Sequence, residues 1–395
     1  MTGFSAGPQA LGYLYQIRYA LYLILNSPEE LELSIESLDD IVFEENGSPQ
    51  ELLQLKHHTT PASLTDSSSD LWKTIRIWST NLRERKISLP NTVLTLVTTS
   101  QAPDDSIAAL LRPDNNRQYR LAATKLLDIA NTSTNTSLTS SFDAFKALTP
   151  NQQEILANSI QILDNSPSIS DTTDQIKYRL NLTARRQYLD ALYERLEGWW
   201  LDKMVRHLSG GSVDLITGFE VRDKIYDIAE QFRPEALPID YLGAEPPTPP
   251  DPDADNRRFV MQLKEIAVNN RRIEKAILDY YRAFEQRSRW AREDLLIGDE
   301  LEQYEKKLVD EWERFYLAMQ DDLQLDEATA TEQDLKQFGR EVYRWVDQVA
   351  KIHIRPRVTE EYVMRGSFHI LADHNPPGVW WHPLFVKRLQ QLLPV

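Results

Sequence analysis

The sequence predicts an N-terminal domain of the α/β or α+β class followed by a mainly α-helical region. Alternating apolar and polar residues, typical of strands, occur between residues 31 and 57, and an apolar β-branched run follows at 93–99. Beyond about residue 106, apolar residues recur every three or four positions, as in amphipathic helices. A chain of 395 residues is also long enough for two or three domains. We therefore expect one domain at 1–165 and a mostly helical assembly or regulatory domain at 166–395.

The composition excludes several classes of protein. The chain has no cysteine, which rules out disulfide scaffolds, thiolate zinc sites and iron–sulfur clusters. The longest apolar stretch near the start, residues 20–25, is far too short to span a membrane and no basic segment precedes it, so we expect a cytoplasmic protein without membrane contact. The net charge of −16 argues against a surface that binds nucleic acid everywhere, but it permits a local basic groove.

The order of the expected N-terminal elements is helix, three strands, helix, strand. Asn46-Gly47 supplies the turn between the second and third strands. The expected helices are 8–26 and 70–86, and the expected strands are 31–36, 40–44, 51–57 and 93–99.

The rest of the chain is expected to be helical, with one linker and one late strand. The segment AEPPTPPDPDAD at 244–255 indicates a stiff, extended and unpacked linker. The apolar residues around Phe368 predict a short strand at 365–372. The expected helices are 118–131, 139–148, 150–163, 183–208, 219–232, 256–288, 299–323 and 332–351.

One group of polar residues in the first strands is suited to phosphodiester chemistry. Strand alternation places Gln54 and Lys56 on one face, and the turn at 46–50 brings Asp40 on the neighbouring strand beside them. Oxygen ligands hold a hard ion such as Mg²⁺ or Mn²⁺, which activates water and neutralises charge on a phosphate. Asp40, Gln54 and the backbone carbonyl of Leu55 are the candidate metal ligands, Glu36 is a possible second carboxylate, and Lys56 would stabilise the anion or position the water.

The alternative interpretation is a solvated hairpin with a surface lysine, because an Asp-x13-Gln-x-Lys spacing arises often by chance. The helix that follows nevertheless carries a local excess of cations, with Lys73, Arg76 and Arg83 as candidate contacts to DNA phosphates or, alternatively, as a solvated face. His57 is a further candidate DNA contact. Adjacent strand residues face opposite ways, so only one of His57 and His58 can face the site.

Four segments, taken in order, resemble the double-strand DNA endonuclease domain of bacterial antiphage effectors. That domain belongs to the PD-(D/E)XK superfamily, in a version with Gln-x-Lys in the third strand, and the resemblance covers about the first 100 to 160 residues. The segments are GYLYQ at 12–16, IESLDDI at 35–41, LQLKHH at 53–58 and LWKT at 71–74.

This resemblance implies a restriction-endonuclease-like fold for residues 1–165 and a set of site residues. Asp40, Gln54 and Lys56 would form the catalytic core of a Mg²⁺-dependent DNA endonuclease, with Glu36 as a ligand. Gln16 would enter the site where many relatives have glutamate. Because glutamine departs from that pattern, its role stays open between a metal ligand and a contact to phosphate or water.

The C-terminal part resembles the appended domain of three-component defence systems, through RGSFHILA at 365–372 and WWHP at 380–383. The nearest named group is the nuclease subunit of Lamassu-type (ABC-three-component) systems. The resemblance implies an SMC-like ATPase and a small third subunit as partners, with double-stranded DNA as substrate. It also implies defence against phages or plasmids by a nuclease that its partners hold inactive. Release would allow self-association to a dimer or tetramer that can cut both strands.

Two other functions remain open on the sequence. The first is a non-catalytic subunit that only binds DNA or partners within an SMC-like ATPase complex. The second is a peptidase or other hydrolase, for which no nucleophile–base spacing is present. The chain also lacks a Gly-x4-Gly-Lys-Ser/Thr motif, so any ATP is expected to bind another subunit.

Overall fold

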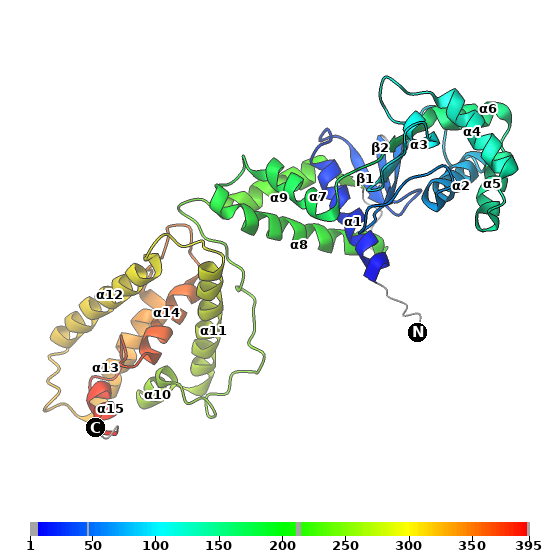
Figure 1. Cartoon of the computed structure of the whole chain (residues 1–395). Coiled ribbons are helices and arrows are strands. Elements are labelled where there is room, and N and C mark those ends of the chain that lie inside the picture. Colours follow the sequence, from blue (N-terminus) through cyan, green and yellow to red (C-terminus); the bar gives the residue numbers. More distant parts are fainter. Residues whose placement is uncertain (1–6, 46, 211–214, 393–395) are drawn as a thin grey trace. The chain divides into compact units, whose positions relative to one another are not determined.

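The computed structural model describes residues 7–45, 47–210 and 215–392. The chain divides into two compact units, residues 1–228 and 229–395. The first unit contains a mixed sheet with helices, and the second is helical in the residues that the structure describes (Figure 1). Within the described ranges, no helix is both long and apolar enough to cross a membrane.

The sheet has six strands in the order β5-β4-β3-β2-β1-β6. β1, β2 and β3 form an antiparallel meander, β6 pairs antiparallel with β1, and β3, β4 and β5 run parallel to one another. The strands are β1 (Glu32–Ile35), β2 (Ile41–Glu45), β3 (Ser48–Lys56), β4 (Val93–Thr98), β5 (Ile160–Leu163) and β6 (Ile216–Thr217). The first four strands occur where strand alternation and β-branched residues predicted them.

The helices of the first unit pack around this sheet. Ser68 caps helix α2 by accepting a hydrogen bond from the Asp70 N–H. The helices are α1 (Gly7–Ile24), α2 (Ser69–Arg83), α3 (Ile107–Leu110), α4 (Tyr119–Thr132), α5 (Thr139–Lys146), α6 (Pro150–Ser159), α7 (Ile169–Leu180), α8 (Leu189–Leu208) and α9 (Gly218–Glu230).

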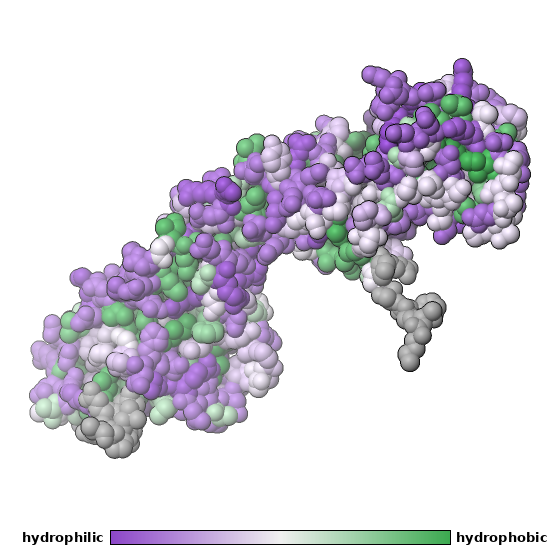
Figure 2. All heavy atoms as spheres, in the orientation of Figure 1, coloured by the Kyte–Doolittle hydropathy of each residue, from purple (hydrophilic) through white to green (hydrophobic). Residues whose placement is uncertain are grey.

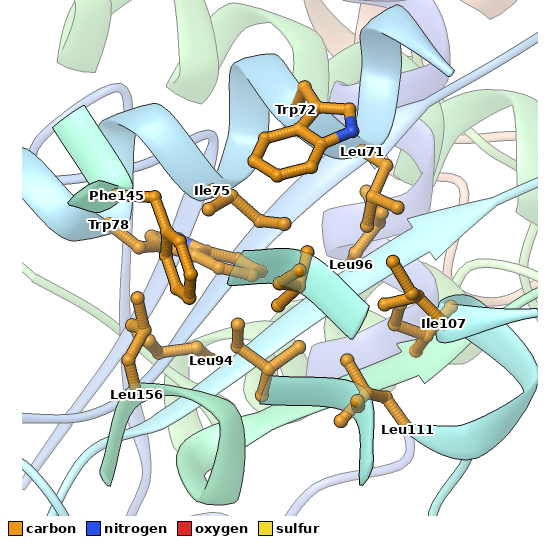
Figure 3. Close-up of a cluster of buried hydrophobic side chains, with 14 of the residues drawn as sticks. Leu71, Trp72, Ile75, Trp78, Leu94, Leu96, Ile107, Leu111, Phe145 and Leu156 are labelled. Carbon is orange, nitrogen blue, oxygen red and sulfur yellow. The ribbon is translucent and has the colours of Figure 1, made fainter. Parts of the chain in front are cut away.

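One apolar core lies between α2 and the sheet. Leu71, Ile75 and Trp78 of α2 point into a cluster with Leu94 and Leu96 of β4 (Figure 3). All five side chains are at most 1% exposed. Burying each of them stabilises the fold by roughly 1.5–3 kcal/mol, so α2 is firmly attached to the sheet.

The first unit extends to residue 228, beyond the expected domain boundary at 165. The reason is that α8 packs against α1, where the Trp200 indole N–H donates to the Ile17 carbonyl at 2.8 Å. Arg18 of α1 also donates to Glu197 of α8 at 2.7 Å. In addition, β6 adds the last strand to the sheet. These contacts join residues far apart in sequence, and periodicity does not reveal them.

Two segments differ in secondary structure from the expectations. Residues 160–163, expected as the end of a helix, form β5, because Ile160 and Ile162 fill buried positions beside β4. Residues 365–372, expected as a strand, belong to α14 (Glu361–Asp373). Almost every side chain of α14 is buried, which removes the alternation between apolar and polar faces that identifies a surface helix.

The second unit is a bundle built around α11 and α14. The expected helix at 256–288 is divided into α10 and α11, because Asn269 caps the start of α11 by accepting from the Arg272 N–H. The other elements of this unit are α10 (Arg258–Glu265), α11 (Asn270–Arg292), α12 (Glu300–Asp322), α13 (Glu332–Arg344), the π-helical turn η3 (Trp345–Val349) and α15 (Phe385–Leu392).

The proline-rich segment at 244–255 is not the unpacked linker that its composition predicts. It lies within the second unit, where Arg282 of α11 donates to the Ala244 carbonyl at 2.8 Å. Pro246, Pro249 and Leu278 line one pocket between this segment and α11. The face of the molecule in Figure 2 is mostly hydrophilic with smaller apolar patches, as expected for a chain of net charge −16.

Candidate active site

The loop at 36–40, which joins β1 to β2, is held by a side chain from α1. The Gln16 amide donates to the Glu36 carboxylate at 3.0 Å and to the Asp40 carbonyl at 2.7 Å. The same carbonyl accepts the Glu36 N–H at 3.1 Å, which closes the loop. Glu36 has a φ of 55°, in the left-handed region that non-glycine residues rarely adopt. Gln16 therefore fixes a tight turn at the start of β2.

Asp40 lies opposite the end of β3. Ile41 pairs with Leu53, so Asp40 stands across from Gln54, and the Asp40 carboxylate accepts the Leu55 N–H at 2.7 Å. Burial raises the pKa of Asp40, and the Leu55 N–H, the Lys56 charge and a hydrogen bond with Gln54 oppose that rise. Asp40 thus interacts with both Gln54 and Lys56, and the catalytic role of the three residues stays a prediction.

The Gln54 side chain has a buried oxygen atom without a hydrogen-bond partner at this site. Its side chain is 4% exposed, and the side-chain carbonyl oxygen Oε1 has no hydrogen-bond partner among the described residues. A buried acceptor left unsatisfied costs roughly 1–3 kcal/mol. A cation beside Oε1 would remove that penalty.

The side-chain oxygen atoms at this end of the sheet are of the type that hard divalent ions bind. Glu36 is close enough to Asp40 for its charge to act on the Asp40 carboxyl. In the part of the chain that the structure describes, no group of three or more acidic or histidine side chains could hold a metal ion. Asp40, Glu36 and the Gln54 side-chain oxygen stay the predicted ligands. Leu55 contributes its N–H to Asp40, and its carbonyl as a ligand stays a prediction.

Asp39 is a buried residue of the site region that the sequence analysis did not single out. Its carboxylate accepts the Trp78 indole N–H at 2.6 Å and the Asp40 N–H at 3.0 Å. Burial raises the pKa of Asp39 to about 6, despite the hydrogen bond from Trp78. Only a contact between residues 39 positions apart reveals this role, so no local pattern could have found it.

The two adjacent histidines face different neighbours. His57 lies against Tyr15 of α1, with ring centroids 4.6 Å apart, and burial lowers the pKa of His57. His58 forms a 2.7 Å hydrogen bond with Asp70 in the first turn of α2. Both histidines follow the last residue of β3, Lys56. His57 as a DNA contact stays a prediction.

The three candidate DNA-contacting cations share the outer side of α2. Lys73, Arg76 and Arg83 are exposed, and they alternate with the residues that α2 buries against the sheet. At 1.5 Å rise per residue they extend over about 15 Å. Arg76 donates to Ser140 of α5 at 3.3 Å. The cations therefore form a row along the helix.

Comparisons with solved structures find distant likenesses. The chain is 15% identical to the Acinetobacter baumannii Cap4 SAVED/CARF-domain containing receptor with the cyclic trinucleotide 3'3'3'-cAAA, with a TM-score of 0.31, covering 58% of this chain and 46% of that one. A Moraxella osloensis Cap4 SAVED/CARF-domain containing receptor is also 15% identical, with a TM-score of 0.31, covering 65% of this chain and 60% of that one. The chain thus spans about half the length of these receptors, and likeness at this level assigns neither fold nor activity.

No curated protein matches the chain. A family model, in contrast, matches residues 259–389, which form most of the second compact unit. This segment includes both stretches, 365–372 and 380–383, that resemble the appended domain of three-component defence systems. Residues 259–389 are therefore a C-terminal domain 7 of the ABC-three component (ABC-3C) systems.

Proposed function

We propose that the first unit is a metal-dependent double-strand DNA endonuclease with a PD-(D/E)XK-type fold. The observation that carries this proposal is the meeting of Asp40 with Gln54 and Lys56, fixed by the 2.7 Å hydrogen bond from the Leu55 N–H to the Asp40 carboxylate. An acid and an amide at one end of a buried strand pair can hold a metal ion, and an amine beside them can stabilise the charge that develops in phosphodiester hydrolysis.

The ion, Mg²⁺ or Mn²⁺, would be held by the carboxylates of Asp40 and Glu36, the Gln54 Oε1 atom and the Leu55 carbonyl. When bound, it would lower the pKa of a coordinated water and neutralise charge on the phosphate. The buried Oε1 atom without a partner supports this assignment, because a carbonyl oxygen can serve as a ligand for hard cations.

The other residues would bind and orient the DNA. Lys56 would donate hydrogen bonds to the scissile phosphate and hold its negative charge as the phosphodiester is attacked. Gln16 would keep the loop at 36–40 in place, so that Asp40 faces Lys56. The row of cations along α2 would contact phosphates of the duplex away from the cleaved bond.

The C-terminal domain 7 supports a role for the whole chain as the effector of an ABC-3C defence complex against phages or plasmids. An SMC-like ATPase and a small third subunit would hold this cytoplasmic nuclease inactive. Release would allow it to self-associate as a dimer or tetramer, because one site cuts one strand and paired sites cut both. Gating is needed because an unregulated nuclease would destroy the host genome.

The test is cleavage of plasmid DNA with Mg²⁺ by the full chain, freed from its partners and also assembled with them. The variants are Asp40→Ala and Lys56→Ala, with Asp143→Ala and Lys146→Ala on α5 as matched controls, since these two residues form an exposed ion pair. We expect each site variant to lose at least about 100-fold in rate, as is typical when a group that stabilises the transition state is removed. The nuclease proposal would be refuted by equal cleavage by all five proteins. It would also be refuted if the wild type cleaved no DNA, either free or assembled with its partners.

The alternative is a non-catalytic subunit that binds DNA or partners. The absence of a three-ligand acidic or histidine cluster within the described ranges favours it, because many metal-dependent hydrolases use such clusters. DNA binding without metal that is unchanged in Asp40→Ala, together with no cleavage by any assembled form, would establish this function.

A further inference from the structure

Asp39 is placed to control the direction of its neighbour Asp40. The Asp39 side chain is 8% exposed, and each of its carboxylate oxygens accepts one hydrogen bond. One bond comes from the Trp78 indole on α2 and the other from the backbone N–H of Asp40. The carboxylate therefore connects the core of the unit directly to the backbone of the candidate metal ligand.

Trp78 is a fixed point for this connection. It is 1% exposed and lies in the core between α2 and the sheet, beside Ile75 and Leu94 (Figure 3). An indole packed on all sides cannot follow a loop that moves, so its N–H holds Asp39 in one place. A charged acceptor makes this hydrogen bond stronger than a neutral one would.

Both backbone polar groups of Asp40 are held by side chains. Its N–H donates to Asp39 at 3.0 Å, and its carbonyl accepts from Gln16 at 2.7 Å. One bond involves the N–H of Asp40 and the other its carbonyl, so together they limit rotation of the Asp40 backbone. The direction in which its carboxylate leaves the chain, toward Gln54 and Lys56, is thereby set before any ion binds.

We infer that Asp39 is a positioning residue for a divalent cation at Asp40, acting through the Trp78–Asp39–Asp40 connection. The inference rests on the proposed function for the identity of the site, and it adds a residue that contacts neither ion nor DNA. The main argument for this role is that burying a carboxylate costs free energy, which the two hydrogen bonds to Asp39 offset. The Trp78 N–H and the Asp40 N–H bond to different oxygens of the Asp39 carboxylate, and an amide of the same size has an acceptor oxygen at only one of these two positions.

The test uses variants that change one bond at a time. Asp39→Asn keeps the size but leaves one acceptor oxygen, so one of the two bonds is lost. Trp78→Phe removes the N–H and keeps an aromatic ring in the core. The matched control is Asn81→Ala, which removes another hydrogen bond from α2 to this loop, a 3.4 Å bond to the Leu38 carbonyl that does not involve Asp40.

Two quantities are measured on the full chain: the affinity for Mn²⁺ without DNA, by electron paramagnetic resonance, and the Mg²⁺ concentration that gives half-maximal plasmid cleavage. We expect Asp39→Asn and Trp78→Phe to weaken Mn²⁺ binding and to raise the required Mg²⁺ by about tenfold or more, as loss of partners behind metal ligands does. High Mg²⁺ should restore the cleavage rate of Asp39→Asn. Asn81→Ala should match the wild type in both quantities.

A purely structural role for Asp39 gives a different result. In that case both variants have lower thermal stability but bind Mn²⁺ as the wild type does, and the inference is overturned. If one variant fails to fold, the other decides. Mn²⁺ binding that depends on Asp40, without any DNA cleavage, would refute the proposed function, and the Mn²⁺ affinities of the variants would then decide the inference. Absence of Mn²⁺ binding by the wild type would overturn both.

Discussion

The Asp40 carboxylate accepts a hydrogen bond from the backbone N–H of Leu55 at 2.7 Å. This bond joins the turn before β2 to the end of β3, beyond the last backbone pair of the two strands at Ile41 and Leu53. It leaves the carboxylate among Gln54, Lys56 and Glu36. A candidate catalytic carboxylate is thus tied to the backbone that carries the candidate amide and amine.

Replacing Gln54 by leucine is expected to abolish DNA cleavage while leaving the free energy of unfolding nearly unchanged. The buried Oε1 atom makes no hydrogen bond among the described residues, so removing it relieves a desolvation penalty that roughly offsets the lost contact with Asp40. We expect the free energy of unfolding of Gln54→Leu to stay within about 1 kcal/mol of wild type. Plasmid cleavage should be lost. Urea denaturation and a cleavage assay on one preparation check this, and a variant that cuts at the wild-type rate would eliminate Gln54 as a ligand.

Removing the cations of α2 should weaken DNA binding without regard to sequence. The triple variant Lys73→Ala, Arg76→Ala and Arg83→Ala deletes up to three phosphate contacts. Each lost contact reduces the slope of log K against log salt by about 1. Titration of a labelled duplex without metal at several salt concentrations measures that slope. Arg120→Ala on α4, where the arginine is paired with Glu154, is the control, and an identical slope in the triple variant would show a solvated face.

A substitution at Gly366 of α14 tests how closely α14 packs against α11 in the second unit. A Cβ atom at this position would overlap the Asp279 carbonyl and the Ala283 side chain of α11, where neither can move away easily. We expect Gly366→Ala to destabilise this unit by about 3 kcal/mol. Gly198→Ala in α8 is the matched control, because a Cβ there meets nothing within 4 Å. Thermal unfolding of the full chain should show loss only in Gly366→Ala, and equal melting of the two variants would contradict the packing of α11 on α14.

The stability of the second unit should depend on pH through Asp279. Burial raises the pKa of Asp279 from 3.8 to about 6, although Arg365 and Arg282 oppose the rise. Between these values Asp279 binds more protons in the folded state than in the unfolded state, so the contribution of Asp279 to stability falls as the pH increases from about 4 to 6. Asp279→Asn removes this effect, and the variant should gain on the order of 1 kcal/mol over wild type above pH 6 and lose that gain near pH 4. Urea denaturation at pH 4.5 and 7.5 measures the difference, and a gain independent of pH would refute the assignment.

The first strands and the grouping of Asp40, Gln54 and Lys56 could be predicted from the sequence. Alternation of apolar and polar residues defines which side chains share a face, and the Asn-Gly pair, of which Asn46 lies outside the described residues, predicts which strands are neighbours. Both signals lie within about twenty residues. Local patterns of this kind are enough to bring the residues of a hairpin together.

The remaining features depend on contacts between distant segments. The bond between Asp39 and Trp78 links residues 39 positions apart, and β5 forms only because β4 offers it a parallel edge. The helix α14 is hidden for another reason. Ten of its thirteen residues are buried, among them Gly366, Ser367 and His369, so polar residues do not mark a solvent-facing side and the sequence pattern indicates a strand.

The central claim is tested most directly by single-turnover cleavage of a labelled DNA duplex by the full chain with Mg²⁺, compared with Lys56→Ala. The account predicts cleavage of both strands by the wild type, a rate at least about 100-fold lower for Lys56→Ala, and unchanged thermal stability of the variant. Equal rates for the two proteins, or an intact duplex with the wild type in every assembly state, would contradict it.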